Sequence, residues 1–166
     1  SNYVNQYRIR DAQDMLLHNP EKTVLAISLE AGFNSKSAFY EAFSRFTKEA
    51  GRIMVVGDDL FATNPGRLQR GVACGAANTM LLKINQIGTV TEALEAAHLA
   101  TIHHYGVTVS LRSNDTNDPF IADFAVAVEA SHIKLGSPVR GERNAKYNRL
   151  IRIESDLGNN TPAHVP

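Results

Sequence analysis

The sequence has 166 residues, of which 43% are hydrophobic and 20% are charged, a composition typical of a globular protein with a packed core. Seventeen basic residues balance seventeen acidic ones, and no apolar run approaches the ~20 residues of a membrane span, so we expect neither a global attraction to nucleic acid nor a membrane partner. The single cysteine, Cys74, excludes a disulfide scaffold and a cysteine-rich zinc module and favours a reducing, cytoplasmic setting.

The N-terminal third of the chain is predicted to be helical. Apolar residues recur at three- and four-residue steps in residues 12–16 and 24–31, which is the period of an amphipathic helix. Asn34 or Ser35 can cap a third helix, whose phenylalanines form one apolar stripe. The expected order is therefore helix, tight turn, helix. The stripe consists of Phe39, Phe43 and Phe46.

From Ile53 onward the pattern changes to strands that alternate with helices. Each of four short apolar runs is followed by a stretch with helical spacing or helix-start signals, of which Asn64 and Pro65 are the clearest. Four βα units of this kind predict an α/β fold with a parallel sheet and right-handed crossovers. The predicted strands lie at 53–56, 80–82, 107–109 and near 133, and the later helices at about 89–103, 120–130 and 143–157.

These patterns divide the chain into three parts. Residues 1–51 form the helical segment, residues 52–158 form the strand-and-helix segment, and residues 159–166 form a tail rich in Asn, Pro and Thr. The junction near Gly51 has no Ser/Gly/Pro spacer and no charge run, which is unusual for two separately folding domains.

A charged residue stands at or just after the end of each predicted strand. Because the carboxyl ends of parallel strands meet at one rim, this placement brings one carboxylate and three cations together. A carboxylate can bind Mg²⁺, Lys and Arg can hold phosphate or carboxylate groups, and a crowded Lys can act as a base. The alternative is that these residues are polar only because loops begin there. They are Asp58, Lys83, Arg112 and Lys134.

Residues 55–158 resemble the C-terminal part of enolase. The resemblance is carried by VVGDDL, TNPGRLQRG, LLKINQIGTVTEAL, IADFAVAV, HIKLGSP and ERNAKYNRLIRIE. It implies the C-terminal half of an enolase-type TIM barrel and a Mg²⁺-dependent lyase chemistry that interconverts 2-phosphoglycerate and phosphoenolpyruvate. The site residues that it implies are Asp58 as metal ligand, Lys83 as the base that removes the α-proton, Arg112 and Ser113 as phosphate contacts, and Lys134 near the substrate carboxylate.

The sequence departs from the enolase pattern in ways that bear on catalysis. Leu111 stands where the family has a histidine, and the acidic, glycine-containing loop of the family reads SNDTND here. The two further metal carboxylates and the general-acid glutamate that the resemblance calls for have no counterpart in these 166 residues. One carboxylate is a poor start for the octahedral oxygen coordination of Mg²⁺. We therefore expect this segment to bind an anion or Mg²⁺ without full catalysis on its own.

The N-terminal segment has a resemblance of its own. YRIRDAQDMLL and VLAISLEAGFNSKSAFYEAFSRFTKEAG, within residues 3–51, resemble the second helix-turn-helix of AraC-type transcription regulators. The resemblance implies DNA binding, with an exposed recognition-helix face and nearby phosphate contacts. Against this, the first 50 residues carry six basic and six acidic residues, so a plain three-helix packing unit is the alternative. The implied DNA-facing residues are Ser35, Lys36, Ser37 and Tyr40, with Arg45 or Lys48 near phosphates.

Three hypotheses therefore follow from the sequence. The first is an enolase-like barrel fragment that binds a phosphorylated small anion, and the second is a DNA-binding regulator fragment. The third is a recombined or engineered chimera without a cellular task. Four βα units leave two open sheet edges, and open edges favour pairing, so a homo-oligomer is expected as well.

Overall fold

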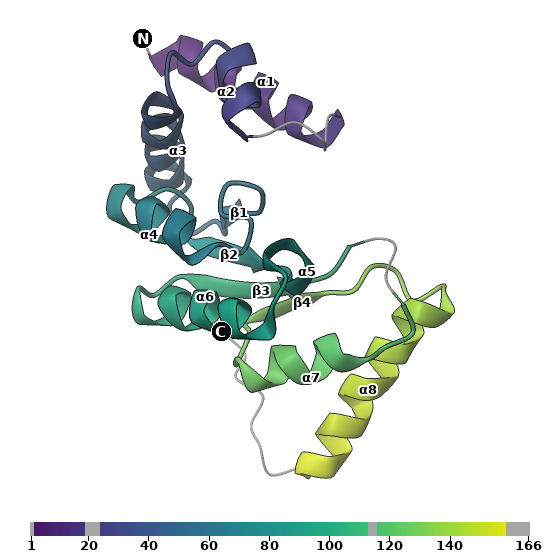
Figure 1. The fold of residues 1–166 in the computed structure, drawn as a ribbon. Coiled ribbons are helices and arrows are strands. Elements are labelled where there is room, and N and C mark those ends of the chain that lie inside the picture. Colours follow the sequence, from purple (N-terminus) through teal and green to yellow (C-terminus); the bar gives the residue numbers. More distant parts are fainter. Residues whose placement is uncertain (1, 19–23, 113–115, 159–166) are drawn as a thin grey trace.

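The computed structural model describes residues 2–18, 24–112 and 116–158, in which three helices precede four strands that alternate with helices (Figure 1). The predicted α/β class is thus confirmed. The elements are α1 (Asn2–His18), α2 (Val24–Glu30), α3 (Lys36–Ala50), β1 (Val56–Gly57), α4 (Pro65–Cys74), β2 (Thr79–Leu82), α5 (Ile84–Ile87), α6 (Val90–Ile102), β3 (Gly106–Ser110), α7 (Phe120–Ala127), β4 (His132–Lys134) and α8 (Gly141–Leu157).

The three N-terminal helices form as the periodicity predicts. Ser35 caps α3, because its hydroxyl accepts a hydrogen bond from the Ala38 amide at 3.1 Å. The ring of Phe39 packs against Phe33 and Phe43, with centroid separations of 5.3 and 5.6 Å. Phe46, predicted to belong to the same stripe, is 40% exposed at the margin of this cluster.

The four strands form one parallel sheet in the order β1-β2-β3-β4. Every strand therefore pairs with its neighbour along the sequence, as a run of right-handed βα units requires. In the described part of the chain, β1 and β4 each have one edge without a pairing strand. The carboxyl ends of all four strands point to the same rim of the sheet.

The first strand is shorter than predicted. Ile53 and Met54 are 67% and 47% exposed and precede β1, although their apolar side chains suggested a buried strand. The side chain of Asn78 holds this stretch in place of a strand ladder: its Oδ1 accepts from the Val55 amide, and its Nδ2 donates to the Ile53 carbonyl. The prediction of a strand over residues 53–56 was wrong for its first part.

The helix boundaries differ from the predictions only at their ends. Helix α6 begins at Val90, with Thr89 as its cap, close to the predicted start at residue 89, whereas α7 ends at Ala127, before the predicted Ala130, and Glu129 adopts a positive φ of 51°. The short helix α5, which follows Lys83, had no sequence signal because it has only four residues. The predicted tail at 159–166 lies outside the described residues.

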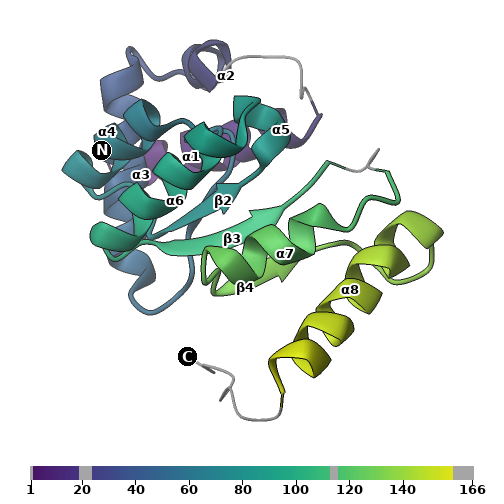
Figure 2. The same cartoon turned by 60° about the horizontal axis from the view of Figure 1, so that its bottom comes forward.

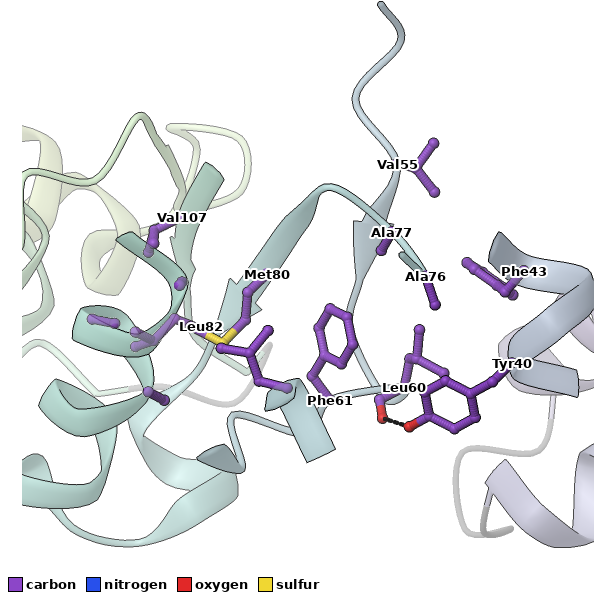
Figure 3. Close-up of a cluster of buried hydrophobic side chains, with 14 of the residues drawn as sticks. Tyr40, Phe43, Val55, Leu60, Phe61, Ala76, Ala77, Met80, Leu82 and Val107 are labelled. Atoms are coloured by element: carbon purple, nitrogen blue, oxygen red, sulfur yellow. Dashed lines mark hydrogen bonds between the residues drawn. The ribbon is translucent and has the colours of Figure 1, made fainter. Parts of the chain in front are cut away.

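Helices α6 and α7 cover one face of the sheet, with α8 packed beyond α7 (Figure 2). Phe61 belongs to the buried hydrophobic cluster (Figure 3). Its ring fills the space left by the missing side chain of Gly71 in α4. Successive strand residues point to opposite faces. Met80, Leu82, Val107 and Val109 therefore pack in the core, and Leu81, Thr108 and Ser110 face the other way.

None of the helices in the described ranges combines the length and the apolar character that a membrane crossing requires.

Candidate anion-binding site

Three of the four predicted strand-end residues line one pocket at the carboxyl rim of the sheet. The pocket has a volume of about 380 Å³ and is lined by Lys83, Arg112 and Lys134, together with Arg143 and Lys146 from α8. Glu142 is the one acidic side chain among its lining residues. The surplus of cations gives the pocket the electrostatic character of an anion site.

Asp58, the fourth strand-end residue, forms an ion pair with Lys83, one of the residues that line the pocket. The Lys83 ammonium donates hydrogen bonds to Asp58 Oδ1 at 2.8 Å and to Oδ2 at 2.7 Å. The side chain of Lys83 is 14% exposed and that of Asp58 is 40% exposed, so the pair lies at the edge of the solvent. The pair neutralises the one strand-end carboxylate.

A hydrogen-bond network fixes the position of this ion pair. The Thr63 hydroxyl accepts from the Lys83 amide at 2.8 Å and donates to Gln86 Oε1 at 2.9 Å. The Gln86 amide nitrogen in turn donates to Asp58 and to Asp59, each at 3.3 Å. Because α5 carries Gln86 one turn after Lys83, the short helix holds the β1 and β2 ends together.

Arg112 and Lys134 are the exposed cations of the pocket. Lys134 is the last residue of β4 and pairs in register with Ser110, whose hydroxyl donates to the Lys134 carbonyl at 3.4 Å. Arg112 follows β3 by two residues. Ser113, the predicted partner of Arg112, lies outside the described residues. Exposed cations at neighbouring strand ends are free to contact an incoming anion.

The contribution of α8 was not predicted from the sequence. Arg143 and Lys146 stand in its first two turns and line the pocket, and Lys146 is buried to 1% exposure. A signal was available, since the helix after a strand begins near the same rim at which that strand ends. Sequence reasoning considered only strand ends and therefore missed these two cations.

Comparisons with known proteins identify the origin of this arrangement. Residues 10–164 match the family described as the enolase C-terminal TIM barrel domain. The chain belongs to the enolase family. It is 60% identical to the enolase of Methanopyrus kandleri over 119 residues, which are 71% of this chain and 28% of that protein. It is 54% identical to the enolase of Pyrococcus furiosus over 132 residues, which are 79% of this chain and 30% of that protein.

The chain spans about 30% of the length of the curated enolases that it matches. The enolase resemblance predicted for residues 55–158 is confirmed. The AraC-type resemblance of residues 3–51 stays a prediction, and the enolase match begins inside that segment, at residue 10.

The described residues do not fit the magnesium ion that the enolase resemblance implies. Both oxygens of Asp58 face the Lys83 ammonium. In residues 2–18, 24–112 and 116–158, His, Cys, Asp and Glu side chains form no cluster of three or more that could hold a metal. Asp58 and its neighbour Asp59 offer two carboxylates here, and both oxygens of Asp58 are engaged by the Lys83 ammonium.

The structure overturns one of the expected DNA contacts. Tyr40 was expected on an exposed face, but it is 7% exposed, and its hydroxyl donates to the Leu60 carbonyl at 3.2 Å (Figure 3). Burial raises the pKa of this tyrosine. Ser37 and Arg45 are exposed, and the Ser35 hydroxyl is engaged as a helix cap. Lys36 begins α3, and the structure does not describe its side chain. Tyr40 joins α3 to the connection that follows β1, and its buried side chain is not exposed for a contact with DNA.

Proposed function

We propose that this chain forms the anion-binding part of an enolase-type site and binds a phosphorylated carboxylate such as 2-phosphoglycerate or phosphoenolpyruvate. The observation that carries the proposal is the convergence of Lys83, Arg112 and Lys134 on one pocket. A phosphate and a carboxylate on one small molecule present two anionic groups, which suits cations from neighbouring strands.

The three cations have different roles in the proposed site. Lys83 is already engaged by Asp58, which leaves the exposed Arg112 and Lys134 to make the main contacts with the ligand. Arg112 offers a planar fork for a phosphate, whereas Lys134 offers a point charge. Leu111 contributes an apolar wall where the enolase pattern has a histidine.

We further propose that the chain binds this ligand without turning it over by itself. The side-chain nitrogen of Lys83 is engaged by both carboxylate oxygens of Asp58, and this ion pair competes with a contact between Lys83 and the ligand. Removal of a proton beside a carboxylate also requires strong stabilisation of the developing charge. The described residues supply cations for this task and no metal centre.

Titration calorimetry with phosphoenolpyruvate tests the binding proposal. The wild-type chain should bind in the absence of divalent cation, and Arg112→Ala and Lys134→Ala should each weaken binding by about tenfold. Lys48→Ala removes an exposed charge from α3 and should leave binding unchanged. Equal affinity in all four proteins, or no binding by the wild type, would refute the proposal. An assay of 2-phosphoglycerate dehydration should give no activity above background.

We also propose that the chain associates with a second copy of itself. One observation supports this: the described sheet has an open edge at β1 and another at β4. Two copies related by a two-fold axis can pair β1 of each with β4 of the other and so close eight strands. Light scattering at micromolar concentration should give a dimer, and a monodisperse monomer would contradict it.

A further inference from the structure

The first two turns of α8 contact both connections that carry the exposed cations of the pocket. Arg112 belongs to the connection between β3 and α7, and Lys134 ends β4 just before the connection to α8. Lys146 reaches the first connection and Tyr147 reaches the second. The helix therefore contacts both connections that carry the exposed cations.

Lys146 holds the first connection through its backbone. Its ammonium is buried and donates to the carbonyl oxygens of Thr116 and Glu142, the latter at 2.8 Å. A buried ammonium needs such acceptors, so its position is strongly determined. Thr116 and Arg112 belong to the same connection between β3 and α7, and Lys146 and Arg112 both line the pocket.

Tyr147 holds the second connection in the same manner. Its hydroxyl donates to the Gly136 carbonyl at 2.6 Å, two residues after Lys134. Arg149, one turn after Lys146, forms a bidentate ion pair with Asp123 of α7, at 2.9 Å from Nε and 2.5 Å from Nη2. Helix α8 is thus itself fixed on the neighbouring helix before it holds the two connections.

We propose that Lys146 and Tyr147 are positioning residues that set the placement of Arg112 and Lys134 for the anion. This inference rests on the proposed function, since it concerns the same pocket. The contact of Lys146 with the Thr116 carbonyl gives it a route to this connection, and its ammonium is shielded from solvent. Tyr147 acts through its hydrogen bond to Gly136.

The test compares three variants of α8 by titration with phosphoenolpyruvate and by thermal unfolding. Lys146→Met and Tyr147→Phe should each weaken binding by about tenfold, because small displacements of the cations reduce their contacts. Arg152→Met is the matched control: it removes an exposed charge from the same helix, has no described ion pair and should leave the affinity unchanged. A loss of thermal stability in Lys146→Met with wild-type affinity would overturn the proposal.

A second set of variants distinguishes positioning from a general weakening of the fold. In an Arg112→Ala background, Lys146→Met should reduce affinity little further, because the residue that it positions is gone. Tyr147→Phe should behave likewise in a Lys134→Ala background, and this pair carries the test if Lys146→Met does not fold. Additive losses in both backgrounds would contradict the proposal.

Hydrogen exchange measured on the peptide that contains Arg112 and Thr116 gives a readout that needs no ligand. Lys146→Met should raise exchange in this peptide selectively, whereas Arg152→Met should not. If the wild-type chain binds no phosphoenolpyruvate, the proposed function fails, and the exchange result still decides whether Lys146 holds the connection. Unchanged exchange would overturn its positioning role.

Discussion

The ammonium of Lys83 lies 2.8 and 2.7 Å from the two carboxylate oxygens of Asp58, across the ends of neighbouring parallel strands. The enolase resemblance implies that one of these residues binds a metal and the other acts as a base. In the structure the two side chains form an ion pair with each other. Arg112 and Lys134 are the exposed cations that remain at this rim.

Asp58→Asn should have two opposite effects, one on the stability of the fold and one on the affinity of the pocket for an anion. Loss of the ion pair should lower the free energy of unfolding by about 1 kcal/mol, because the pair is partly exposed. The affinity for phosphoenolpyruvate should rise severalfold, since a negative charge beside Lys83 is removed. Urea unfolding and titration calorimetry measure the two effects.

Asp59→Asn is the matched control for this prediction. Asp59 carries the same charge one residue later, and its described contact is with Gln86. It should therefore change the affinity less than Asp58→Asn does. Weaker binding by Asp58→Asn would show that Asp58 supports the anion site instead of opposing it.

Gly71→Ala tests the packing of α4 against Phe61, which lies in the connection between β1 and α4. A Cβ at Gly71 would stand 2.3 Å from the ring of Phe61, which is fully buried. Overpacking of this kind should lower the free energy of unfolding by about 2 kcal/mol. At Gly66, in the same helix, the nearest neighbour of the new Cβ is Asn64 Oδ1 at 3.4 Å. Gly66→Ala should therefore be neutral or stabilising, and equal stability of the two variants would contradict this view of the core.

Much of the fold could be predicted from local signals. The Asn64 cap with Pro65 and the alternation of short apolar runs with helical patterns place α4, α6 and the strands within a few residues. The errors have local causes as well. Ile53 and Met54 are as apolar as strand residues, but the side chain of Asn78 binds the Ile53 carbonyl and the Val55 amide in place of a strand partner. That contact joins residues about 25 positions apart, which a local pattern does not reveal.

The site could be predicted less completely than the fold. Strand-end placement brought Lys83, Arg112 and Lys134 to one pocket, because parallel strands share a rim. The same reasoning gave no account of the pairing of Lys83 with Asp58, which depends on side-chain direction. It also missed Lys146, because a lysine inside a polar helix looks like a solvated residue until its burial is known.

The ion pair between Asp123 and Arg149 predicts a pH dependence of stability. Hydrogen bonds from the Arg149 guanidinium hold the pKa of Asp123 below its ordinary value of 3.8. The depressed pKa means that the stabilisation is present above about pH 4 and is lost as the pH falls through the folded-state pKa. Arg149→Met should therefore unfold at lower urea than the wild type at pH 6, and the difference should shrink below pH 4. A constant difference across this range would contradict the assignment.

The raised pKa of Tyr105 predicts a loss of stability at alkaline pH. Burial, with a smaller effect of Cys74, raises the pKa of Tyr105 from 10.0 to about 12, and its hydroxyl donates to the Ala76 carbonyl at 3.2 Å. A raised pKa gives stabilisation that is complete below pH 10 and is lost as the pH rises through 12. In a spectrophotometric titration, Tyr105→Phe should remove a late transition near pH 12. Retention of that transition would assign it to another tyrosine.

A crystal structure of the chain with phosphoenolpyruvate, grown without divalent cation, tests the central claim most directly. We expect density for the ligand in the pocket at the strand ends, with its anionic groups within hydrogen-bond distance of Arg112 and Lys134. An empty pocket at saturating ligand, or a ligand bound elsewhere on the chain, would contradict the account.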